Sequence, residues 1–253
     1  MRVESERPVT GSDGAVGWIH RTGVFDESLP PPPPRRVYTP MPKQRLARFA
    51  EIHARYLSLT KGTWLAHLAD SLGVTLHSLK RLDAAWAGCH GAWSFPMRDA
   101  EGDVTGLRLR NNEGDKWCVS GSKQGLFYDP RRALHDPVLI PEGPTDTAAL
   151  LDLGFSAVGR PSCRGGGPQL MQMLAGRSVV IVSDRDEAHF RPDESVYYPG
   201  QEGAADLARQ MVGVCSSVKV IQPPKPYKDA RQWIISGITA SRIQLSIEIA
   251  YEW

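Results

Sequence analysis

The 253-residue sequence lacks the features that mark secreted, membrane and zinc-binding proteins. Its four cysteines form no CxxC pair, and no Cys/His set has the spacing of zinc ligands. No segment approaches the roughly 20 apolar residues of a membrane helix, and the N-terminus lacks the apolar core of a signal peptide. We therefore expect a reduced, cytoplasmic protein with no membrane partner.

The sequence also has no excess of charge of one sign. With 30 Lys and Arg against 28 Asp and Glu, its formal net charge is +2, which argues against a uniformly basic nucleic-acid-binding protein. The local distribution is uneven, however. Residues 35–61 hold seven basic side chains and one acid, whereas residues 183–206 hold seven acids and two arginines. The small net charge is thus a cancellation between a basic surface suited to polyanions and an acidic region suited to a metal ion.

Residues 1–42 are predicted to be a disordered, proline-rich tail or linker. The five prolines at 30–34 favour an extended polyproline II conformation and cannot continue a helix. A docking ligand for a proline-recognising module is the alternative to a spacer.

Residues 43–88 are predicted to be helical. An amphipathic helix ends at Gly62, Thr63 caps a second helix that Gly73 ends, and Thr75 caps a third. The last two helices have the pattern of a helix-turn-helix, but we favour helices that pack beside a catalytic domain.

The pattern changes after residue 88. Residues 89–136 contain short β-rich segments with turns between them, which predicts a small basic α+β subdomain. From residue 137 to the end, apolar strands alternate with helices. This alternation predicts an α/β domain of Rossmann-like topology, with a parallel sheet, helices on both faces and further C-terminal helices.

Acidic side chains follow two strands of the predicted parallel sheet. Glu142 follows the strand VLI, and Asp184 and Asp186 follow the strand SVVIVS. Because ligands bind at the carboxyl ends of such strands, we expect these acids to meet at one edge and to bind Mg²⁺. Gly143 allows a phosphate to approach the backbone closely, and Asp146 either caps the next helix or adds a carboxylate. The alternative is that the two aspartates are ordinary turn and capping residues.

This constellation resembles the TOPRIM domain of bacterial-type primases, topoisomerases and certain nucleases. The matching residues are Glu142-Gly143 with Asp146, Asp184-x-Asp186 and Lys228-Asp229. The resemblance implies that Glu142 is a general acid/base and that Asp184 and Asp186 bind Mg²⁺. It also implies that Asp229 joins the metal site.

The region before the acids narrows the resemblance to primase catalytic cores. The segments FPMRD (95–99), GDVTG (102–106), LRLR (107–110) and GSKQGLF (121–127) look like the stretch before the TOPRIM domain in bacterial and phage primases. The residues that would contact nucleotide or DNA phosphates are Arg108, Arg110, Lys116, Lys123, Gly143 and Lys228. The alternative for the two arginines is an exposed strand face.

The sequence departs from that family in three places. Residues 1–62 contain no cysteine for an N-terminal zinc-binding domain, and no Walker motif of a helicase is present. The segment 187–200 is inserted where the family has a short turn.

The glycine-rich loop 161–167 is either a further phosphate cradle or a surface loop.

We therefore expect an Mg²⁺-dependent primase-type nucleotidyltransferase, with Mn²⁺ as a substitute ion, that makes short RNA primers on single-stranded DNA from nucleoside triphosphates. A replicative helicase or another replication protein is its expected partner. The alternatives are a TOPRIM nuclease and a non-catalytic DNA-binding accessory protein of a mobile element.

Overall fold

The computed structural model describes residues 8–10, 16–18, 39–191 and 194–253. The chain divides between Arg36 and Val37 into two units. In the first unit, β1 (Pro8–Thr10) pairs antiparallel with β2 (Val16–Trp18), which the sequence pattern had not predicted. The proline run at 30–34 lies outside the described residues, so the expected spacer remains a prediction.

The second unit begins with three helices, α1 (Lys43–Leu59), α2 (Gly62–Leu72) and α3 (Leu76–Arg81). The prediction that Thr63 caps α2 is wrong, because the carbonyl of Lys61 already accepts the first helical hydrogen bonds and Gly62 lies inside the helix. Thr75 does cap α3, accepting a 3.1 Å hydrogen bond from the Ser78 amide.

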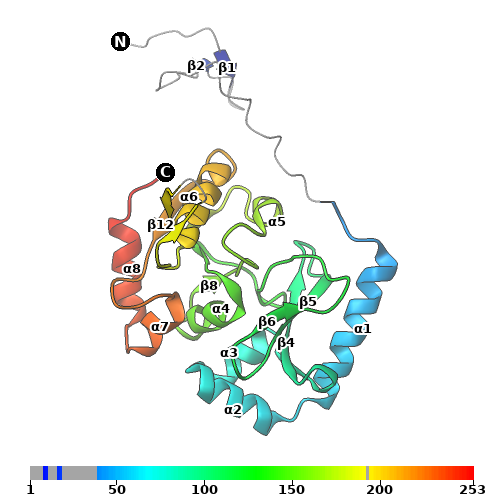
Figure 1. The fold of residues 1–253 in the computed structure, drawn as a ribbon. Coiled ribbons are helices and arrows are strands. Elements are labelled where there is room, and N and C mark those ends of the chain that lie inside the picture. The colour runs from blue at the N-terminus through cyan, green and yellow to red at the C-terminus, as the bar shows by residue number, and fades with distance from the viewer. Residues whose placement is uncertain (1–7, 11–15, 19–38, 192–193) are drawn as a thin grey trace. The chain divides into compact units, whose positions relative to one another are not determined.

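An antiparallel sheet follows, in the order β3 (Ala85–Ala87), β4 (Ala92–Arg98), β5 (Val104–Arg110) and β6 (Lys116–Cys118). Strand β3 falls within the segment predicted to be helical, because its three residues pair with the start of β4 across a tight 3₁₀ turn. Helix α1 packs along this sheet (Figure 1).

The parallel sheet has the order β12 (Ser217–Ile221), β9 (Ser178–Val182), β7 (Val138–Ile140) and β8 (Ser156–Ala157). All its pairs are parallel, as predicted. Five helices accompany the sheet: α4 (Gly143–Asp152), α5 (Gly167–Met173), α6 (Pro199–Met211), α7 (Ala230–Ile235) and α8 (Ala240–Ile249).

Alternate side chains of each strand enter two separate cores. Leu139 and Val180 pack with residues of α4, α7 and α8, whereas Ile140 and Ile181 pack with residues of α5 and α6. Figure 1 shows α7 and α8 on one side of this region and α5 on the other. The predicted α/β arrangement, with helices on both faces, is therefore confirmed.

Paired charges join α3 and the antiparallel sheet to the segment before β7. Arg98, from the FPMRD segment, lies 2.6 Å from Asp83, and Arg81 lies 3.1 Å from Asp129. Arg131 contacts both aspartates. Arg98 therefore has a structural role, because it links β4 of the antiparallel sheet to the turn after α3.

Within the inserted segment 187–200, β10 (His189–Phe190) pairs antiparallel with β11 (Val196–Tyr197). Residues 202–205, which follow the inserted segment, lie inside α6. No helix in the described part of the chain is long and apolar enough to cross a membrane.

Candidate active site

Five carboxylates lie along the carboxyl edge of the parallel sheet, and the charges of the other four act on Asp184. Glu142 is the N-cap residue of α4 after β7, and Asp146 lies in the first turn of that helix. Asp184 and Asp186 follow β9, which is the neighbour of β7. Asp229 caps α7 and accepts a 2.7 Å hydrogen bond from the Gln232 amide. The topology thus brings together acids that are up to 87 positions apart, from Glu142 to Asp229.

Burial and mutual repulsion hold protons on this cluster. Burial, followed by the charges of Asp146 and Glu142, raises the pKa of Asp184 to about 8. Burial, followed by the charge of Asp229, raises the pKa of Asp146 to about 7. Burial also raises the pKa of Glu142, against the opposing charge of Arg160. Buried, unneutralised carboxylates of this kind are typical of functional sites.

Protein donors also bind two more of the five carboxylates. Asp186 accepts a 2.8 Å hydrogen bond from the Gly200 amide and lies 3.6 Å from the Lys228 ammonium. Asp146 accepts a 2.8 Å hydrogen bond from the Arg231 amide.

Within the described residues, no three His, Cys, Asp or Glu side chains are gathered closely enough to hold a metal ion. The donor set nevertheless fits Mg²⁺ in kind, because hard carboxylate oxygens are its preferred protein ligands and it retains several of its waters. A divalent cation would supply the positive charge that the mutually repelling acids lack.

Arg160 is a buried cation at this edge that the sequence analysis missed. Its side chain is 1 % exposed. Its Nη1 donates to the Cys163 carbonyl at 2.7 Å and to the Gly203 carbonyl at 3.1 Å. Its Nε and Nη2 have no hydrogen-bond partner among the described residues, and its charge acts on Glu142 and Asp184. The strand-end rule that identified Glu142 also applies to Arg160, which lies three positions after β8 and forms a parallel bridge with Glu142.

Three of the predicted phosphate-binding cations lie beside the carboxylates. Arg110, at the end of β5, interacts with Asp146 and Asp229, while burial and the neighbouring Arg231 lower its pKa. Lys116, at the start of β6, acts on Glu142 and Asp146. Lys228 lies next to Asp186, as described above.

The other two predicted cations contact backbone carbonyls instead. Arg108 donates to the Pro161 carbonyl at 2.9 Å, and Lys123 donates to the Thr39 carbonyl at 3.3 Å. Both brace loops, so their roles in phosphate binding remain predictions. Gly143 has a φ of +80°, and no atom lies within 4 Å of the position that a Cβ would take, which leaves open space above the helix start.

The glycine-rich loop 161–167 is packed against the rest of the fold. A Cβ on Gly165 would lie 2.8 Å from the Gln124 side-chain oxygen, and Gly166 has a φ of +84°. These glycines therefore allow the loop to pass close to the segment around Gln124, which accounts for them without a bound phosphate.

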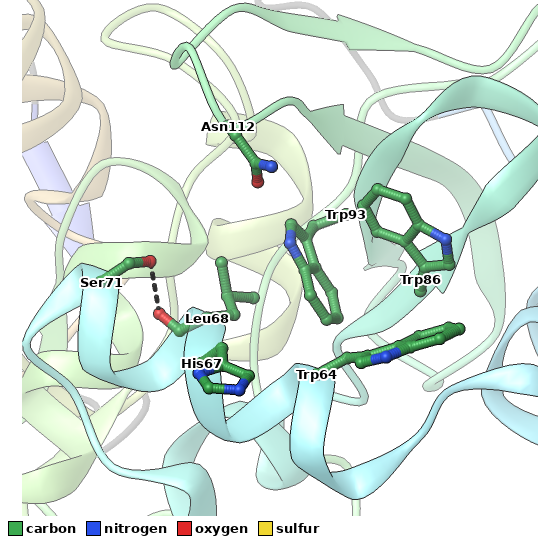
Figure 2. A pocket seen from close by; sticks show the side chains of 7 residues that line it. All are labelled: Trp64, His67, Leu68, Ser71, Trp86, Trp93 and Asn112. Carbon is green, nitrogen blue, oxygen red and sulfur yellow. Dashed lines mark hydrogen bonds between the residues drawn. The ribbon is translucent and has the colours of Figure 1, made fainter.

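A pocket of about 430 Å³ opens beside the antiparallel sheet (Figure 2). It is lined by Trp64, His67, Leu68, Ser71, Trp86, Trp93 and Asn112. Trp86 stands edge-on to Trp93 with ring centroids 5.3 Å apart and to Trp64 at 6.5 Å, and the Lys61 ammonium lies 4.9 Å from the Trp64 ring. Trp93 pairs with Arg110 across β4 and β5, so the pocket adjoins the basic strand end.

Comparisons by sequence find nothing: no protein-family profile matches the chain, and no curated protein matches it. Solved structures do match. The catalytic core of the Escherichia coli primase is 14 % identical, with a TM-score of 0.62 over 82 % of this chain and 80 % of that one. A DnaG primase catalytic domain bound to single-stranded DNA is 15 % identical, with a TM-score of 0.63 over 83 % and 82 %.

A more distant match lies in a phage protein. The primase fragment of the bacteriophage T7 primase-helicase is 15 % identical, with a TM-score of 0.52 over 70 % of this chain and 72 % of that fragment. The fold of this chain is therefore that of primase catalytic cores, which the sequence resemblance predicted. The shared fold includes the antiparallel sheet and the four-stranded parallel sheet of this chain.

Proposed function

We propose that this protein is an Mg²⁺-dependent primase-type nucleotidyltransferase that synthesises short RNA primers on single-stranded DNA. The observation that carries the proposal is the set of five interacting carboxylates at the carboxyl edge of the parallel sheet, with Arg110 and Lys116 beside it. Phosphoryl transfer needs this combination, because a metal ion and cations neutralise the charge that develops on the phosphate.

Each acid has a distinct role in the proposed reaction. Asp184 and Asp186, with Asp229, would hold Mg²⁺, which supplies charge neutralisation for the transferred phosphoryl group. Glu142 would accept the proton of the attacking 3′-hydroxyl as the new phosphodiester bond forms and pyrophosphate leaves. Burial raises the pKa of Glu142, and the nearby Arg160 guanidinium opposes that rise, which favours the ionised form that a base requires.

The basic and aromatic side chains would hold the substrates. Arg110 and Lys116 would orient phosphates next to the carboxylates. The tryptophan pocket beside Arg110 would take a base of the single-stranded template, since each base stacked on an aromatic ring contributes about 1–3 kcal/mol. We also propose that this protein works with another replication protein, such as a helicase.

The test is primer synthesis by the full chain, with a single-stranded DNA template, labelled nucleoside triphosphates and Mg²⁺. We expect short labelled RNA from the wild type and a loss of about 10²-fold or more in Glu142→Gln. Glu248→Gln, on the exposed face of α8, is the matched surface control. Mg²⁺-dependent loss of template would instead indicate a nuclease, and DNA binding without any reaction would indicate an accessory protein.

A further inference from the structure

A second pocket, of about 860 Å³, opens directly beside Asp186. One wall comes from the inserted segment and the start of α6, including Tyr198 and Gln201. The opposite wall comes from the loop before α7, including Lys225, Tyr227 and Lys228. The insertion that distinguishes this chain from the short turn of the primase family therefore builds part of a cavity at the carboxylate site.

Hydrogen bonds fix both walls to the end of β9. Arg185 donates from Nε and Nη2 to the Pro223 carbonyl at 3.0 and 2.7 Å, and its amide donates to the Lys228 carbonyl at 2.6 Å. On the other side, the Gly200 amide binds the Asp186 carboxylate at 2.8 Å, and Gln201 donates to the Asp186 carbonyl at 3.3 Å. The pocket is thus held open by the same residues that position Asp186.

The lining combines cations, rings and acceptors. Lys228 lies 3.6 Å from Asp186, and Lys225 is exposed at the rim. Tyr198 is 44 % exposed and Tyr227 is half-buried, so both rings are accessible. The side-chain oxygen of Gln201 is buried and has no hydrogen-bond partner among the described residues, which leaves an acceptor for a hydroxyl or amino group.

This mixture suits a nucleotide better than a nucleic-acid backbone. A strand of phosphates requires a continuously basic groove, whereas this pocket also exposes the acids Asp186 and Glu187. A triphosphate that shares a divalent cation with Asp186 can lie against two lysines, and its ribose and base can contact tyrosine rings. The volume lies within the range of ligand pockets, roughly 300–1,000 Å³.

We propose that this pocket receives the incoming nucleoside triphosphate, with Lys225 and Lys228 on its phosphates and Tyr198 and Tyr227 beside its ribose and base. This inference rests on the proposed function and deepens it, because it assigns nucleotide selection to the inserted segment. Template DNA would then bind on the other side of the carboxylates, along the antiparallel sheet.

The test measures nucleotide and DNA binding separately in the full chain. An N-methylanthraniloyl-labelled ATP with Mg²⁺ reports nucleotide affinity by fluorescence, and a labelled single-stranded oligonucleotide reports DNA affinity by anisotropy. For Lys225→Ala and Tyr198→Ala we expect the nucleotide Kd to rise about tenfold, as for the loss of one charge-assisted or stacking contact, with DNA affinity unchanged. Arg242→Ala on α8 and Tyr251→Ala are the matched exposed controls, for which neither affinity should change.

The results separate this inference from the proposed function. If nucleotide affinity falls in both pocket variants but the wild type makes no primer, the pocket stands and the proposed function fails. If the wild type makes primers and the KM for nucleotide is unchanged in both pocket variants, the function stands and the pocket assignment is wrong. Weaker DNA binding with unchanged nucleotide affinity would also overturn the assignment.

Discussion

The two sheets of this protein carry charges of opposite sign at the ends of their strands. The carboxyl edge of the parallel sheet carries buried carboxylates, which raise one another's pKa values. The antiparallel sheet carries Arg110 and Lys116 at its strand ends and tryptophan rings beside them. The net charge of +2 conceals this separation, because the charges of the two regions cancel in the sum.

The same contrast separates structural charges from candidate functional ones. Arg98 and Asp83 form a close pair in which both side chains are largely shielded from water. Asp184 is also shielded, but its strongest electrostatic neighbours are other acids. Paired buried charges hold a fold together, and unpaired ones of like sign need a ligand.

The largest expected effect distinguishes the acids from a basic residue that braces a loop. Asp184→Asn removes a carboxylate of the proposed metal site, so primer synthesis should fall by about 10²-fold or more while single-stranded DNA binding is unchanged. Arg108→Ala should reduce synthesis far less, because Arg108 is bound to the Pro161 carbonyl. Equal losses in the two variants would contradict the separation of roles between the sheets.

The second effect is on stability. Arg98→Met leaves Asp83 without its closest cation, and we expect the free energy of unfolding to fall by about 3 kcal/mol. Arg209→Met breaks the exposed pair with Asp206 and should change it by less than about 0.5 kcal/mol. Urea denaturation of the two variants measures both changes. A small loss in Arg98→Met would contradict the structural role assigned to this arginine.

The third effect is on template affinity. Trp64→Ala removes one ring of the tryptophan pocket, and the Kd for single-stranded DNA should rise about tenfold. The KM for nucleotide should be unchanged. Leu57→Ala, on α1 outside the pocket, is the control with the same exposed fraction of 39 %. Anisotropy measurements in which both variants bind DNA equally well would exclude the pocket from the template path.

The smallest effect is the dependence of stability on pH. The folded-state pKa of Asp184, about 8, lies above its ordinary value of 3.8, so the folded protein binds this proton more tightly than the unfolded chain does. The resulting stability is complete below about pH 4 and is lost as the pH rises through about 8. Metal-free protein should therefore melt at a lower temperature at pH 8.5 than at pH 6, and Asp184→Asn should reduce that difference. Thermal melts that show the opposite slope for this pair would refute the repulsion argument.

The sequence predicted the strand ends that carry Glu142 and Asp184, because short apolar runs followed by acids are a local pattern. It predicted the Thr75 cap for the same reason. It did not predict Arg160, whose burial depends on the carbonyl of Gly203, 43 positions away. The tryptophan pocket and the pocket beside the inserted segment were also not predicted, since each requires contacts between distant parts of the chain.

The central claim is that the carboxylates at the edge of the parallel sheet form a divalent-cation site. Titration of Mn²⁺ into the protein, followed by electron paramagnetic resonance of the free ion, tests this claim without relying on activity. We predict that the wild type and Arg108→Ala bind Mn²⁺ alike and that Asp184→Asn binds it at least about tenfold more weakly. Equal Mn²⁺ binding by the wild type and Asp184→Asn would contradict the account.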